Sequence, residues 1–302
     1  MFSKVLVGID GGSGGRDALA LGRRLAAPGA ALVLGYVWGS ADGVIAAMTG
    51  APHPAATGHE LLQAELLAAD VTCSTDVRPA SSTAAGLHEM AEELGCDLLV
   101  VGSPERQVGG HGLMGGHARL ALHAAPCAVA VSPRGYAATD RAMTNVGVGY
   151  QETAAGDVAL QTARRIALTF GAGLDVLSVV APMPSRWTNE PYALLVELDA
   201  LLDIRVKEAQ ARLEALEGCT VFVRRGEPVD RLLEFSKDVS LLVLGSRGYG
   251  PVRRMLLGST SNAVVQDASC PVLVLTRPLL DEPARRANAA VERPAATRTA
   301  GA

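Results

Sequence analysis

The chain has 302 residues, of which 49% are hydrophobic and 19% are charged, and its formal net charge at pH 7 is −4. This apolar content is enough for a sizeable core and excludes wholesale disorder. Only 4% of the residues are aromatic and there is no surplus of Lys and Arg, so we expect no nucleic-acid partner, because such binding relies on cationic charge and base stacking. The length predicts two domains of about 150 residues each.

The sequence also predicts a cytoplasmic protein that does not enter a membrane. The apolar run from Val5 to Ile9 is cut by Asp10 before it reaches the length of a signal-peptide core, and other apolar runs have the length of strands. The five cysteines are scattered and odd in number, which predicts buried reduced thiols. His117 and His123 would face different ways on a helix, so we expect no metal site.

The sequence repeats itself at an offset of about half its length, which predicts two copies of one domain. At an offset of 141 residues the identities include Val7/Val148, Gly8/Gly149, Gly15/Gly156, Leu19/Leu160 and Arg24/Arg165. At an offset of 143 residues they include Leu99/Leu242, Gly102/Gly245, Ser103/Ser246, Cys127/Cys270 and Val131/Val274.

Short β-branched or Leu-rich runs alternate with helical patterns in each copy, which is typical of βαβ units and a parallel sheet. The expected strands of the first copy are Lys4 to Ile9, Ala31 to Val37, Val71 to Val77, Asp97 to Val101 and Ala128 to Ser132. Those of the second are Asn145 to Tyr150, Leu174 to Val180, Thr220 to Arg224, Ser240 to Leu244 and Pro271 to Thr276. The fold class is therefore α/β, with two tandem five-stranded parallel sheets and helices on both faces.

Other segments complete the expected domain plan. Ala41 to Gly58, which contains Pro52 and Pro54, is expected to be irregular, and Leu195 to Leu216 is expected to be a long helix. A polar join near Ala142 separates domains at residues 1–141 and 142–278, and residues 279–302 are expected to form a flexible tail.

The segment from Leu244 to Val264 carries the most specific pattern in the chain. Gly245 and Gly248 follow an expected strand, and after nine residues Gly258-Ser259 opens an expected helix. Glycines let the backbone turn sharply and approach a ligand, and a helix start offers free amides to an anion such as phosphate. On physical grounds alone, a phosphate site and a purely structural loop with an ordinary helix cap remain equal alternatives.

The first copy begins with KVLVGIDGG at Lys4 to Gly12, and the second copy has the spacing G-x2-G-x9-G-S and ends in CPVLVL. Together these motifs resemble the universal stress protein family in its tandem two-domain form. The resemblance covers about residues 1–277. It implies Rossmann-like domains of strand order 3-2-1-4-5, domain pairing through the last strand within the chain or in a homodimer, and ATP binding in a stress or dormancy role. The site residues it implies in the second half are Gly245, Ser246, Gly248, Gly258, Ser259, Thr260 and Gln151.

The two copies depart from that pattern in different ways. The first copy has Gly102 and Gly115, but Glu105 replaces the second glycine and no hydroxyl residue follows Gly115. It keeps Asp10, which matches the family position for the adenosine end, whereas the second copy has Gln151 there. Because a carboxylate disfavours phosphate, we expect ATP, with or without Mg²⁺, mainly in the C-terminal half and a weak or empty N-terminal site.

Two other functions compete with an ATP-dependent regulator that acts on an unidentified protein partner. One is an interaction scaffold that binds no nucleotide. The other is an adenylating enzyme, because Ser13 to Asp17 resembles the phosphate loop of ATP pyrophosphatases, although Ala18 replaces its last serine. No general base is recognisable, so the chain is expected to hydrolyse ATP slowly at most.

Overall fold

The computed structural model describes residues 1–69, 73–103, 125–139, 141–182, 192–246 and 258–275. Its strands are β1 Phe2–Gly8, β2 Ala26–Gly39, β3 Ser74–Ala80, β4 Leu98–Gly102, β5 Ala128–Ser132, β6 Asn145–Gly149, β7 Gly173–Val180, β8 Thr220–Arg225, β9 Leu241–Gly245 and β10 Val272–Leu275. Its helices are α1 Ser13–Leu25, α2 Ser40–Thr49, α3 Pro54–Ala69, α4 Thr83–Glu93, the short 3-10 turn η1 Tyr136–Ala138, α6 Ala154–Phe170, α7 Tyr192–Leu213, α8 Pro228–Phe235 and α9 Ser259–Asp267.

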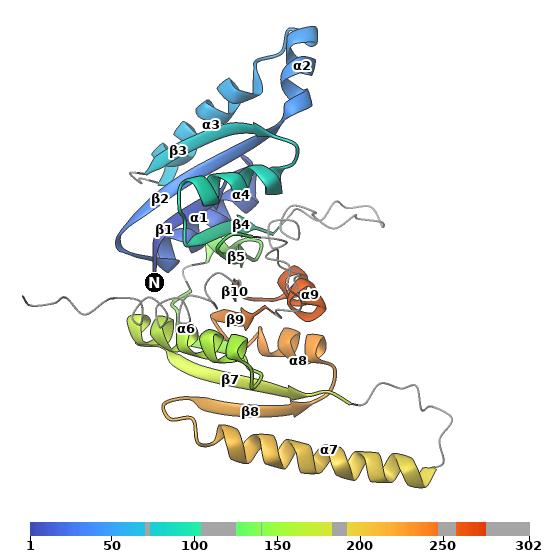
Figure 1. Cartoon of the computed structure of the whole chain (residues 1–302). Helices are drawn as coiled ribbons and strands as arrows, with labels where there is room; N and C mark the ends of the chain where they lie inside the picture. Colours follow the sequence, from blue (N-terminus) through green and yellow to red (C-terminus); the bar gives the residue numbers. More distant parts are fainter. Residues whose placement is uncertain (70–72, 104–124, 140, 183–191, 247–257, 276–302) are drawn as a thin grey trace, which may run out of the picture.

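The predicted strand order 3-2-1-4-5 is confirmed in both halves, but the two sheets are joined into one. The order across the ten strands is β3-β2-β1-β4-β5-β10-β9-β6-β7-β8, and Figure 1 shows them stacked from β3 at the top to β8 near the bottom. Within each half every neighbouring pair is parallel. The α/β fold is therefore confirmed, with a single continuous sheet in place of two separate ones.

The junction between the halves is an antiparallel pair formed by β5 and β10. Leu273 lies opposite Ala130, with Val272 opposite Val131 on one side of it. These residues are almost completely buried, so neither strand is left as an exposed edge that a second chain extends. The pairing between domains is thus intramolecular in this chain.

Both faces of the sheet are covered by helices, as expected. Val5 and Val7 point to the face covered by α1, α3, α6 and α7, whereas Leu6 points to the face covered by α4, α8 and α9. Alternate residues of a strand face opposite ways, so apolar runs buried on both sides are typical of parallel sheets. Each hydrophobic core extends through both halves.

Two local expectations are wrong. The segment from Ala41 to Gly58 is not irregular, because most of it lies in α2 and in the start of α3. Gly50 ends α2 with a φ of 70°, and Pro54 is the first residue of α3, a position where the missing amide hydrogen costs little. The bounds of two strands also differ: the second begins five residues earlier than expected, at Ala26, and the third begins and ends three residues later, at Ser74–Ala80.

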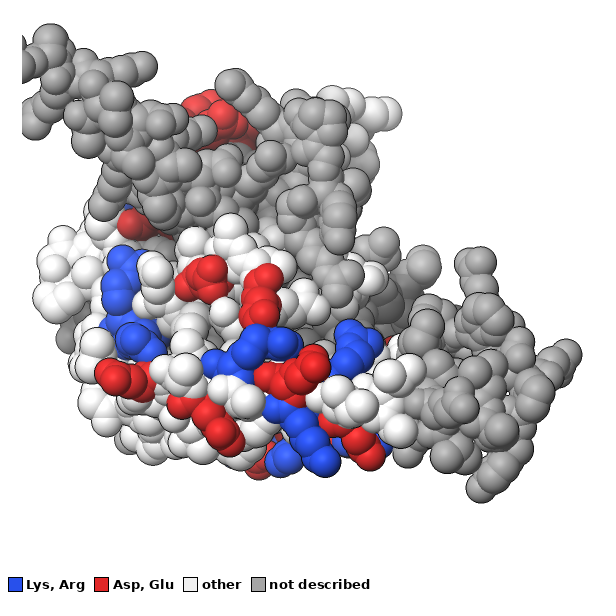
Figure 2. Space-filling view, turned by 60° about the horizontal axis from the view of Figure 1, so that its bottom comes forward, with Lys and Arg blue, Asp and Glu red and all other residues white. Residues whose placement is uncertain are grey.

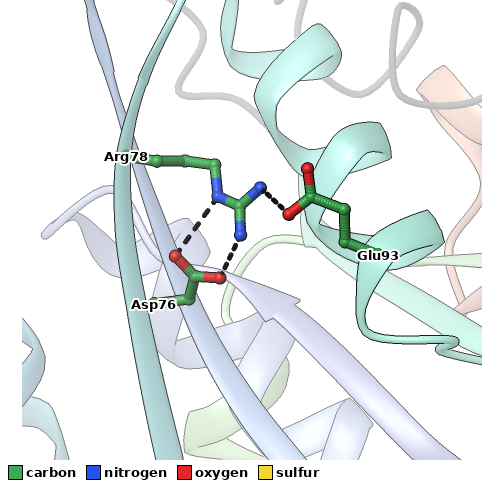
Figure 3. Close-up of polar contacts among 3 residues, drawn as sticks. All are labelled: Asp76, Arg78 and Glu93. Atoms are coloured by element: carbon green, nitrogen blue, oxygen red, sulfur yellow. Dashed lines mark hydrogen bonds and ion pairs between the residues drawn. The ribbon is translucent and has the colours of Figure 1, made fainter.

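Each outermost strand is tied to a neighbouring helix by an arginine. On β3, Arg78 binds both carboxylate oxygens of Asp76 and donates to Glu93 of α4 at 2.6 Å (Figure 3). On β8, Arg225 donates to Asp203 of α7 at 2.7 Å. Charges on an edge strand also oppose edge-to-edge association.

The face formed by α7 and β8 carries charges of both signs. Figure 2 shows Lys and Arg intermixed with Asp and Glu among the described residues of this face. Arg212, for example, pairs with Glu152 at 2.8 Å. Where the structure is described, this face therefore has no broad basic patch of the kind that attracts nucleic acid.

The linker between the halves is held against α1 by Asp17. The Asp17 side chain is only 3% exposed and accepts hydrogen bonds from the backbone amides of Gly135 at 2.8 Å and Ala137 at 2.7 Å. About two turns further along α1, Arg24 donates to the hydroxyl of Tyr136 at 3.0 Å and lies over its ring. These contacts fix the position of the linker.

Candidate strand-end site

The carboxyl ends of β6 and β9 form the candidate site of the C-terminal half. The two strands are parallel neighbours, with Gly149 opposite Leu244, so Gln151 and Ser246 lie at the same level two residues further on. The chain leaves these strands in opposite directions, toward β7 and toward β10. Such a divergence opens a crevice in which α/β proteins bind ligands.

Gly245 is required by the packing of the protein itself. A Cβ atom at this position would lie 2.8 Å from the backbone oxygen of Ala155 in the first turn of α6. The strand and the helix start therefore approach too closely for any side chain. Ser246 follows and is 1% exposed, and its amide donates to the backbone oxygen of Leu275 at 3.2 Å.

The helix that the glycine motif predicts is present as α9. Gly258 is its N-cap and offers no side-chain cap, Ser259 is exposed and Thr260 is half-buried. The first amides of a helix lack partners inside it, so this end suits an anion. Gly248 lies outside the described residues.

The direction of α9 places its start at the same edge of the sheet as the strand-end crevice. After α9, Pro271 leads into β10, and its backbone oxygen accepts from the amide of Leu242 near the beginning of β9. The nine residues of α9 rise about 13 Å, close to the length of about 16 Å of a five-residue strand. Because the helix ends at the amino edge, its N-terminus lies toward the carboxyl edge.

Gln151 is exposed at this crevice. Its backbone oxygen accepts from the amide of Thr153 at 2.7 Å, and the Thr153 hydroxyl in turn caps α6 by accepting from the amide of Gly156 at 3.1 Å. The side-chain amide of Gln151 can both donate and accept hydrogen bonds. The start of α6 is thus already capped by its own chain.

Tyr150 and Asp157 form a pair beside Gln151 that the sequence interpretation missed. The Tyr150 hydroxyl donates to Asp157 Oδ1 at 2.8 Å. Burial, and then this bond to a carboxylate, raise the pKa of Tyr150 to about 12. A phenol that stays protonated keeps this hydrogen bond at neutral pH and braces the first turn of α6 against β6.

The N-terminal half has an equivalent crevice between β1 and β4. Asp10 is exposed there, and its Oδ1 accepts from the amide of Gly12 at 2.9 Å. Gly102 again meets a helix start, because a Cβ there would lie 2.1 Å from the backbone oxygen of Gly14. Gly115 and Glu105 lie outside the described residues.

The geometry of Asp17 argues against the adenylating alternative. In that interpretation Ser13 to Asp17 would hold pyrophosphate, but the Asp17 carboxylate is buried and bonded to the linker. A carboxylate saturated by two backbone amides has a structural role in this chain, and the segment forms the first turns of α1.

Within the described part of the chain, no three His, Cys, Asp or Glu side chains are close enough together to hold a metal ion. Over the same residues, no helix combines the length and the apolarity that a bilayer crossing requires.

These features define a tandem α/β protein with a strand-end crevice in each half, and the chain belongs to the universal stress protein family. The family profile, described as "Universal stress protein family", matches residues 1–133 and again residues 143–276. The universal stress protein Rv2319c of Mycobacterium tuberculosis is 28% identical over 218 residues, which cover 69% of this chain and 74% of the relative. A universal stress protein of Mycolicibacterium smegmatis is 33% identical over 141 residues, covering 42% of this chain and 46% of the relative.

Solved structures show the same fold over nearly the whole chain. A universal stress protein from Archaeoglobus fulgidus is similar with a TM-score of 0.61 and 18% identity, covering 91% of this chain and 96% of that one. A putative universal stress protein from Pseudomonas aeruginosa has a TM-score of 0.59 and 19% identity, covering 95% and 98%.

Proposed function

We propose that the chain is an ATP-binding regulator whose main nucleotide site lies at the strand-end crevice of the C-terminal half. The observation that carries this proposal is the placement of the α9 N-terminus, capped by a glycine, at the edge where β6 and β9 diverge. The amides and hydroxyls of Ser259 and Thr260 would face the phosphates, and Gln151 would face the adenosine end. Magnesium would accompany the phosphates, since it is usually held by substrate phosphates in such sites.

The donor set fits this ligand better in the C-terminal half than in the N-terminal one. Backbone amides and hydroxyls at a helix start stabilise phosphate without a cationic side chain. In the N-terminal half Glu105 replaces the second glycine of the motif, and a carboxylate at that position would repel phosphate unless a cation intervenes. We therefore expect one strong ATP site in each chain.

The test is calorimetric titration of the full chain with ATP and magnesium. Gly258 has φ −59° and ψ 142°, a conformation that any residue adopts, so Gly258→Val adds bulk at the start of α9 without backbone strain. The matched control is Ala268→Val, because Ala268 caps the other end of α9 with φ −62° and ψ 142°.

One ATP per chain, weakened at least tenfold by Gly258→Val and not by Ala268→Val, is the expected result. Two ATP per chain would show a second phosphate-binding site outside the strand-end crevice of the C-terminal half. No binding, or equal affinity of both variants, would contradict the ATP site and favour a scaffold.

Regulation would follow if ATP changes a surface that a partner recognises. A ligand shifts a conformational equilibrium only by its difference in affinity for the two states. We expect saturating ATP to slow hydrogen exchange between residues 246 and 258. Unchanged exchange in that segment would contradict the switch while leaving ATP binding intact.

The scaffold remains the second candidate because α2 exposes apolar side chains. Val44 is 62%, Ile45 55% and Met48 82% exposed, and Figure 1 shows α2 at the far end of the N-terminal half, beyond the sheet. Neighbouring exposed apolar residues are typical of protein-contact surfaces. Substituting Met48 by Glu would abolish partner capture in a scaffold and leave ATP affinity unchanged.

A further inference from the structure

A second cavity lies at the junction of the two halves, away from the strand-end crevice of the C-terminal half. Its volume is about 450 Å³, within the range of about 300–1,000 Å³ typical of small-molecule sites. The linker and the turns that precede β6, β9 and β10 form its walls. It therefore opens at the amino edge of the C-terminal half, across the sheet from α9's N-terminus.

The walls of this junction cavity carry an excess of positive charge. Among the described residues that line it, four carry cationic side chains and one, Asp238, carries a carboxylate. The cations are Arg24, Arg134, Arg141 and Lys237. For a chain whose overall charge is negative, this is a local reversal of sign, and a concave surface of one sign attracts small ions of the other.

Three of these cations form no salt bridge with Asp or Glu among the described residues: Arg24, Arg141 and Lys237. Arg24 is half-buried and donates to two neutral oxygens, the Tyr136 hydroxyl and the backbone oxygen of Arg141. Cations gathered without carboxylates repel each other, so an anion that enters the cavity relieves this repulsion.

The cavity also presents neutral donors on a fixed framework. Burial raises the pKa of Tyr136, although Arg24 acts in the opposite direction, so the phenol keeps its proton and can donate it to an anion. The Ser240 hydroxyl accepts from the amide of Thr144 at 3.1 Å, which fixes the wall before β6. Asp17 fixes the opposite wall through the linker amides. Preorganised donors reduce the ordering cost of binding.

We propose that this junction cavity binds a small anion that bears at least two phosphate groups. The cations come from three separate segments, α1, the linker and the turn after α8, so an anion with several phosphate groups can contact more of them than a single phosphate can. Arginine suits this ligand because its planar fork pairs with phosphate oxygens. Such an anion bridges the two halves.

The probe that tests this inference is inorganic triphosphate, titrated calorimetrically into the full chain at low salt. Arg141→Gln combined with Lys237→Gln removes two charges from exposed side chains. The bond from Arg24 to Arg141 uses the backbone oxygen, so it survives this change. The matched control, Arg212→Gln with Arg225→Gln, removes two charges from the distant α7 and β8 face.

The expected result is one triphosphate site whose affinity falls about tenfold in the cavity variant and is unchanged in the control and in Gly258→Val. If two sites appear, loss of one of them in the cavity variant alone supports the inference. No binding at millimolar triphosphate, or equal weakening in both double variants, overturns it. Loss of all binding in Gly258→Val, with the cavity variant unaffected, also overturns it and assigns the anion to the strand-end crevice.

Discussion

Asp17 is predicted to be the main polar attachment between the first helix and the linker. It accepts from the amides of Gly135 and Ala137, and a hydrogen bond to a charged group contributes about 1.5–3 kcal/mol. Both linker residues are exposed, so water replaces part of each lost bond. We therefore take the lower end of that range and expect Asp17→Asn to lower the free energy of unfolding by about 2–3 kcal/mol.

The control for this variant is Asp157→Asn in the second half. Asp157 is exposed and accepts one hydrogen bond, from Tyr150, so its loss should cost about 1 kcal/mol or less. For 302 residues the unfolding entropy is about 0.6 kcal/mol/K, so Asp17→Asn lowers Tm by about 3–5 °C and Asp157→Asn by less than about 2 °C. Calorimetry measures both values.

Hydrogen exchange separates this explanation from a general loss of stability. The amides of Gly135 and Ala137 should lose protection in Asp17→Asn before the sheet does, since their acceptor is weakened directly. Equal Tm shifts in the two variants, or unchanged exchange at these two amides, would refute the assigned role of Asp17.

Three further predictions follow from buried or paired side chains. Burial raises the pKa of Cys270 to about 12, so at pH 8 iodoacetamide should label the less buried Cys219 well before Cys270 in the native chain, and equal labelling rates by mass spectrometry would contradict this. Replacing Arg78 by Met should lower the free energy of unfolding by about 1 kcal/mol in urea, and no change would show that its ion pairs contribute nothing. Since the folded-state pKa of Tyr150 is raised to about 12, its contribution is present below pH 10 and is lost as the pH rises toward 12. Tyr150→Phe should flatten that loss in alkaline melts, and an identical pH profile would refute it.

The sequence predicted the strands well because their apolar runs are buried on both faces. Such runs are more continuously apolar than those of a half-exposed sheet, and the repeat supported the first, fourth and fifth strands of each copy through identities with their counterparts. The joining of β5 to β10 was not predictable in the same way. The sequence of each strand predicts only that it is buried. Whether its unpaired edge bonds to the other half or to a second chain depends on tertiary contacts.

The segment after β2 was misinterpreted because its glycines and prolines were taken as signs of irregular structure. In the structure Gly50 adopts a left-handed conformation that ends α2, and Pro54 starts α3. Both residues mark helix boundaries. Glycines and prolines alone do not show whether a segment is a boundary between two helices or an irregular loop.

The strand and the helix that flank the glycine motif are present as predicted, but the packing role of its first glycine was missed. Gly245 was expected to admit a ligand, whereas its missing side chain is already required by Ala155 of α6. Gly102 meets Gly14 in the same way, although the rest of the first motif differs. The first glycine of the motif therefore reports the close packing of strand and helix and does not by itself indicate a ligand. A difference in ATP affinity between the two halves must therefore come from the residues around α9.

The divergence of the two copies at the start of their first helices has a local explanation. Asp157 corresponds to Arg16 in the first copy, and its partner Tyr150 corresponds to Ile9, so carboxylate and phenol are present together or absent together. Asp17 likewise corresponds to Val158, and it binds the linker, which exists once in the chain. Each of these paired polar groups appears only where its partner does, because an unpartnered buried one is costly. By the same reasoning, the junction-cavity cations that form no salt bridge among the described residues, Arg24, Arg141 and Lys237, are the groups that the proposed anion would neutralise.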